Sequence, residues 1–90
     1  MKTEFLLMAQ YDGMAVIPAD IVCRDYFRHL DPLKFCRKAE AGEIRIPIVR
    51  MEPSQKSAKG VHLSDLAAYL DQAREAAIKE LAQITRGIPA

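Results

Sequence analysis

The chain has 90 residues, which is enough for one domain but not for two, so we expect residues 1–90 to form a single domain. Hydrophobic residues make up 50%, charged residues 28%, and the formal net charge is only +1, the balance of a soluble globular chain. No apolar run approaches the ~20 residues that span a membrane, and the run 5–9 is too short for a secretion signal, so the expected location is the cytoplasm.

The first predicted element is a helix over residues 3–11, which Thr3 would cap with its hydroxyl. A hairpin is the alternative, because the Asp12-Gly13 dipeptide flanked by apolar residues is a typical turn sequence. Residues 16–17 follow as a short extended segment, the conformation favoured just before a proline.

A second helix is predicted from Pro18 to about Arg28, since proline suits the first turn of a helix. Ile21, Val22 and Tyr26 recur at helical spacing and predict its buried face. The charged residues between them are expected to face water.

A third helix, residues 33–41, has clear start and stop signals. Asp31 can cap it, Pro32 suits its first position, and Gly42 can end it. The predicted core-facing side of this helix presents Leu33, Cys36 and Ala39 or Glu40 at successive turns. Two short helices joined by a tight turn form a helix-turn-helix unit.

Two strands and a loop are predicted next. The alternating residues Ile44, Ile46 and Ile48 indicate a half-buried strand, and the proline between them places it at a sheet edge. Residues 52–60 form a basic polar loop, and residues 61–63 return as the second strand of a hairpin.

The last predicted helix spans residues 64–85, with Ser64 as its cap and Asp65 in its first turn. Apolar residues at spacings of three and four form one stripe along it. Because the helix is longer than the core needs, its C-terminal part is the predicted dimer interface. The residues of that interface are Ala73, Ala77, Ile78, Leu81 and Ile84.

Positive charge is concentrated in residues 24–59, which hold nine Lys or Arg against five Asp or Glu, a net +4. Such an excess is typical of polyanion binding but also of an ordinary solvated surface. Lys34, Arg37 and Lys38 lie three and four positions apart, on one face of the third helix, which suits the major groove of DNA. A solvated helix face is the alternative for these three residues.

The predicted hairpin offers a second set of donors, suited to phosphate oxygens and the minor groove. Its candidate DNA-binding residues are Arg45, Arg50, Ser54, Gln55, Lys56, Ser57 and Lys59. Arg24 and Arg28, on the second helix, would hold the DNA backbone beside them. The alternative for the loop is an ordinary mobile surface segment.

No catalytic, metal or cofactor site is predicted. Cys23, Cys36, His29 and His62 lack zinc-site spacing, and both cysteines are expected to be reduced and buried. The chain has no nucleophile-elbow, phosphate-loop or dinucleotide-binding motif, so it is not expected to be an enzyme.

Seven short motifs occur in order along residues 3–73. They are Phe5–Tyr11, Val16–Pro18, Val22–Phe27, Lys38–Gly42, Ile46-Pro47, Ser54–Lys56 and Val61–Asp71. Together they resemble the pyocin activator protein family, and the architecture is similar to that of winged-helix phage excisionases and MerR-type regulators. The resemblance implies a small bacterial DNA-binding activator of phage-tail-like bacteriocin genes, and it implies that Ser54–Lys56 matters to function.

The sequence therefore predicts an α+β winged helix-turn-helix protein with a β-hairpin wing and a long C-terminal helix. The expected partners are double-stranded DNA, RNA polymerase and a second copy of the chain in a homodimer. No membrane partner is expected, and the protein would act at the nucleoid. Two alternatives are an excisionase-like protein that bends DNA and a protein-interaction module such as an antirepressor.

Overall fold

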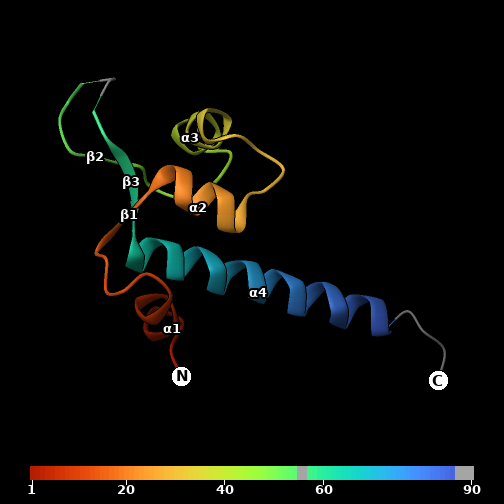
Figure 1. The fold of residues 1–90 in the computed structure, drawn as a ribbon. Coiled ribbons are helices and arrows are strands. Elements are labelled where there is room, and N and C mark those ends of the chain that lie inside the picture. The colour runs from red at the N-terminus through yellow and green to blue at the C-terminus, as the bar shows by residue number, and fades with distance from the viewer. Residues whose placement is uncertain (55–56, 87–90) are drawn as a thin grey trace.

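The computed structural model describes residues 1–54 and 57–86, which form an α+β fold (Figure 1). Four helices and a three-stranded antiparallel sheet make up this part of the chain. In chain order they are α1 (Thr3–Gln10), β1 (Val16–Pro18), α2 (Ala19–Tyr26), α3 (Pro32–Glu40), β2 (Val49–Arg50), β3 (Lys59–His62) and α4 (Leu63–Arg86). Within this part, no helix is both long and apolar enough to cross a membrane.

Strand β3 lies at the centre of the sheet, with β1 on one side and β2 on the other. Gly60 pairs with Pro18 of β1 and with Val49 of β2. A Cβ atom at position 60 would lie 2.6 Å from Cγ1 of Val16 and 2.8 Å from the carbonyl oxygen of Ile17. Only glycine therefore lets β1 approach β3 this closely.

The core gathers side chains from all parts of the fold. The largest fully buried side chains are Phe35, Ile17, Leu66, Val22, Val61 and Cys23. Helix α2 lies between α3 and α4 (Figure 1). Just beyond it, the ring of Phe27 packs on Phe35 of α3 at 4.8 Å and on Tyr69 of α4 at 5.7 Å. One aromatic side chain thus joins the two outer helices through the core.

The predicted helix at the N-terminus is confirmed, but its cap is not. Lys2 occupies the N-cap position without a side-chain hydrogen bond, and Thr3 is already helical. The Thr3 hydroxyl instead donates to Asp71 Oδ1 of α4 at 2.5 Å. The Thr3 hydroxyl thus bonds to a residue distant in the sequence instead of capping its own helix.

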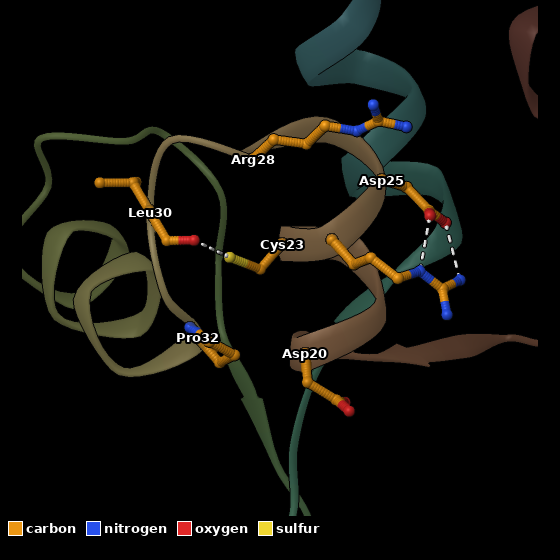
Figure 2. Close-up of a pocket in the computed structure, with 7 residues that line it drawn as sticks. Asp20, Cys23, Asp25, Arg28, Leu30 and Pro32 are labelled. Atoms are coloured by element: carbon orange, nitrogen blue, oxygen red, sulfur yellow. Dashed lines mark hydrogen bonds and ion pairs between the residues drawn. The ribbon is translucent and has the colours of Figure 1, made fainter.

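Helix α2 is shorter than predicted at both ends. Pro18 is the last residue of β1, where it pairs with Gly60, and the helix starts one residue later. It ends at Tyr26, two residues before Arg28. The Cys23 thiol donates to the carbonyl oxygen of Leu30 at 3.1 Å, which ties the following turn back to the helix (Figure 2).

Helix α3 has the predicted signals but a different buried face. Asp31 Oδ1 accepts the backbone N–H of Lys34 at 2.8 Å, and Gly42 ends the helix with φ of 81°. The prediction that Leu33 is buried is wrong, since 60% of it is exposed, while Phe35 is completely buried. Phe35 lies only about 100° around the helix from Cys36, so these two define the buried side.

The strand predicted from Ile44 to Arg50 is confirmed only at its end, since Val49–Arg50 pair with β3 and the residues before them do not. Ile44 and Ile46 are nevertheless buried, so the alternation is correct. Extending the ladder would place Pro47 opposite His62. Proline has no N–H to donate there, so the segment packs on the core without pairing.

The cap predicted for the last helix is also corrected. Helix α4 begins at Leu63, so Ser64 lies inside its first turn. The Ser64 N–H is accepted by Nδ1 of His62 at 3.1 Å, so His62 satisfies one of the unpaired donors at this helix end. From Asp71 to Arg86 every residue of α4 is exposed, and the helix continues well beyond α1 and α2 (Figure 1).

Candidate nucleic-acid interface

Helix α3 presents the predicted basic face. Phe35 and Cys36 fix its inner side, and Lys34, Arg37 and Lys38 are all exposed on the other side. Within residues 1–54 and 57–86, no ion pair or side-chain hydrogen bond involves these three side chains. Their charges are therefore available to an external anion.

The hairpin is also basic, but two of its cations are already paired. Arg50 Nη2 lies 2.9 Å from Glu40 Oε2, and Lys59 Nζ lies 3.0 Å from Glu40 Oε1. The hydrogen bond from Lys59 and the charge of Arg50 hold the pKa of Glu40 below its usual value. Glu40 is the last residue of α3, so it joins that helix to both strands of the hairpin.

The other predicted hairpin residues fall into three groups. Arg45 is exposed on the segment that leads into β2. Ser54 is exposed, and the Ser57 hydroxyl donates to the carbonyl oxygen of Glu52 at 2.9 Å, which closes the loop locally. Gln55 and Lys56 lie outside the described residues.

Arg24 and Arg28 line a pocket of about 350 Å³ between α2 and the start of α3 (Figure 2). Arg24 Nε contacts Asp25 Oδ1 at 3.0 Å, and the Tyr11 hydroxyl donates to Asp25 Oδ2 at 2.7 Å. Arg24 and Tyr11 lower the pKa of Asp25. Because Asp20 and Asp25 also line this pocket, its two arginines are offset by two acids.

Cys23 and Cys36 are both reduced and buried. Burial raises the pKa of the Cys23 and Cys36 thiols, which keeps them protonated and poorly nucleophilic at neutral pH. Among the described residues, no three His, Cys, Asp or Glu side chains form a group that could hold a metal ion.

Comparison with protein families adds a decisive observation. A family model described as pyocin activator protein PrtN matches residues 3–77 of this chain. The chain belongs to the pyocin activator protein family. Searches of curated proteins and of solved structures found no match. The resemblance over residues 3–73 is thus confirmed, and the match extends into the exposed part of α4.

The family match covers every candidate DNA-binding residue, from Arg24 to Lys59. It also includes Ala73 and Ala77 of the predicted dimer interface. Ile78, Leu81 and Ile84 lie beyond it. The pyocin activator family is a regulatory one, and its match spans the basic surface of this chain but not the end of α4.

Two residues of this surface were missed by the sequence reasoning. Glu40 could not be singled out, because its two cationic partners lie 10 and 19 residues away. Leu33 was assigned to the core, yet it lies one helical turn before Arg37 on the exposed basic face. In each case the missing information was how α3 is rotated against the hairpin and the core.

Proposed function

We propose that this pyocin activator family protein activates transcription of pyocin-like, prophage-derived or bacteriocin genes by binding double-stranded DNA. Its site of action would be the nucleoid in the cytoplasm, with residues 1–90 as one domain. Helices α2 and α3 would serve as the helix-turn-helix, and the β2–β3 hairpin as the wing. The family supports the activator role, and the basic surface supports DNA as its target.

The observation that carries this proposal is the exposed basic face of α3, whose cations form no ion pair with the residues that the structure describes. Lys34, Arg37 and Lys38 project from a helix whose opposite side is fixed by Phe35. A helix of this diameter fits the major groove, where Arg and Lys donate to guanine O6 and N7. Lys34 and Lys38 would hold phosphates or bases beside Arg37, and Arg28 would contact the backbone nearby.

The wing would approach the DNA beside α3 through Arg45 and the loop residues. Ser54, Gln55, Lys56 and Ser57 belong to this proposed contact because their side chains suit phosphate oxygens. Activation would also involve a contact with RNA polymerase, for which the DNA-bound protein would provide the surface.

Two copies of the chain would bind together through α4. All of its residues from Asp71 to Arg86 are exposed. The exposed fractions of the large apolar side chains Ile78, Leu81 and Ile84 are 44–61%. Pairing two such helices would remove this apolar surface from water. Ala73 and Ala77 would allow close approach, and Phe5 and Leu6 of α1, each 55% exposed, would extend the contact. Two half-sites would then lie about one helical turn of DNA, ~10 bp, or a multiple of it apart.

Selection of bound sequences from random duplex DNA tests the proposal. We expect an enriched motif with two half-sites, whose binding weakens steeply as salt is raised. A folded protein that binds no duplex at low salt would contradict it and favour a protein-interaction role instead. Bending of the selected DNA without activation of a promoter reporter would indicate an excisionase-like role.

The dimer has its own test in sedimentation equilibrium. Wild type should have the mass of two chains, and Leu81→Asp should have the mass of one, because a buried unpaired carboxylate opposes association. Glu80→Asp, a neighbouring change that keeps the charge, should remain dimeric. A monomeric wild type at micromolar concentration would rule out α4 as a stable dimer interface.

A further inference from the structure

Glu40 connects three elements through one carboxylate. Its Oε2 accepts from Arg50 on β2 and its Oε1 accepts from Lys59 on β3. Arg50 and Lys59 are directly opposite each other in the β2–β3 ladder. Glu40 thus contacts both strands of the hairpin at the same level, from the C-terminal end of α3.

The arrangement also resolves a repulsion within the hairpin. Like charges directly opposite each other on neighbouring antiparallel strands destabilise the pair. Here the carboxylate lies between the two cations and offsets them. No other ion pair or side-chain hydrogen bond joins α3 to β2 or β3 in the described part of the chain. Glu40 is therefore the side chain through which α3 makes polar contact with the hairpin in this part of the chain.

We propose that Glu40 is a positioning residue for DNA recognition, and that Arg50 and Lys59 serve this contact instead of binding phosphate. This inference rests on the proposed function. A hairpin held at one angle to α3 can contact the backbone in only one register relative to the bases that α3 reads. A released hairpin, carrying two unpaired cations, could contact phosphates on any sequence, because phosphate contacts carry no base information.

Glu40→Gln tests the proposal, because it removes the carboxylate charge and keeps the shape. Affinity for a shuffled duplex should rise by about tenfold, and the slope of log K against log salt should steepen by about 0.9 for each phosphate newly contacted. The preference for the selected sequence over the shuffled one should fall by about tenfold, which a purely structural role would not produce. Glu40→Asp, which keeps the charge, should retain part of the preference.

Glu43→Gln is the matched control. Glu43 is exposed in the turn just after α3, and its side chain forms no ion pair among the described residues. Glu43→Gln removes one negative charge, as Glu40→Gln does. Its affinities for the selected and the shuffled duplex should therefore change by the same factor, and the preference for the selected sequence should remain. Both variants should melt within about 5 °C of wild type, since exposed ion pairs contribute little to stability.

The possible outcomes distinguish a failure of the Glu40 inference from a failure of the proposed DNA-binding function. If wild type binds no duplex, the proposed function fails. If wild type is sequence-specific but Glu40→Gln and Glu43→Gln have the same preference and salt slope, the inference is overturned. Should Glu40→Gln not fold, the double variant Arg50→Gln/Lys59→Gln removes the same contact from the other side. It should lose sequence preference with an unchanged salt slope, and a retained preference would overturn the inference.

Discussion

The basic face of α3 and the basic hairpin differ in one respect that a count of charges does not show. Lys34, Arg37 and Lys38 make no ion pair among the described residues, whereas Arg50 and Lys59 share Glu40. Equal charges in the sequence thus have unequal roles in the fold. Three cations are available to an external polyanion, while two are used to join the hairpin to the helix.

The largest expected effect comes from removing the anchor that orients α3. Phe35→Ala should lower the free energy of unfolding by about 3–5 kcal/mol, because the ring is completely buried. Urea denaturation followed by circular dichroism measures this change. Leu33→Ala, on the exposed side of the same helix, should change it by less than about 0.5 kcal/mol. A larger loss for Leu33→Ala would show that α3 is rotated differently.

In the hairpin, the substitution expected to destabilise the fold is Gly60→Ala. The added methyl group would meet β1 at 2.6–2.8 Å, so the sheet must separate locally. We expect a loss of about 1–3 kcal/mol in the free energy of unfolding, typical of overpacking. Denaturation at several urea concentrations provides the measurement. An unchanged midpoint would mean that β1 and β3 do not approach each other as described.

A smaller effect should distinguish Arg45, in the segment that leads into β2, from Arg50 of β2. Arg45 is exposed, whereas Arg50 contacts Glu40. Arg45→Gln should flatten the slope of log K against log salt by about 0.9, the value for one phosphate contact. Arg50→Gln should leave the slope unchanged. Fluorescence anisotropy with a labelled duplex measures both, and the reverse result would assign the phosphate contact to Arg50.

The smallest effect is a pH dependence of stability. Lys59 and Arg50 lower the pKa of Glu40 from its usual 4.5, so the folded state favours the charged carboxylate. The stabilisation is fully present above pH 4.5 and is lost as the pH falls through the lowered pKa. The difference in unfolding free energy between wild type and Glu40→Gln should therefore shrink in acid. A difference that stays constant down to about pH 3 would contradict this origin.

Local signals in the sequence predicted the helices well. Asp31, Pro32 and Gly42 act within one or two turns of α3, so its ends could be predicted without knowledge of the rest of the fold. The family resemblance was likewise carried by ordered short motifs, and the family match confirms it. The candidate DNA contacts remain predictions, although the exposure of Lys34, Arg37 and Lys38 is consistent with them.

Features that depend on distant partners could not be predicted. The extent of β2 depends on its pairing with β3, the central strand of the sheet. Thr3 and Ser64 were predicted to be helix caps, but the Thr3 hydroxyl bonds to Asp71 and the Ser64 N–H bonds to His62. The pairing of Glu40 requires the hairpin and α3 to be placed in space. Helical spacing alone left open whether Leu33 or Phe35 faces the core.

The most direct test of the account compares the salt dependence of DNA binding in two multiple variants. One replaces Lys34, Arg37 and Lys38 with Gln, and the other replaces Arg50 and Lys59 with Gln. The account predicts that the first flattens the slope of log K against log salt by about 2–3, at about 0.9 per lost phosphate contact, while the second keeps the wild-type slope. A flatter slope in the second variant, with no change in the first, would contradict it.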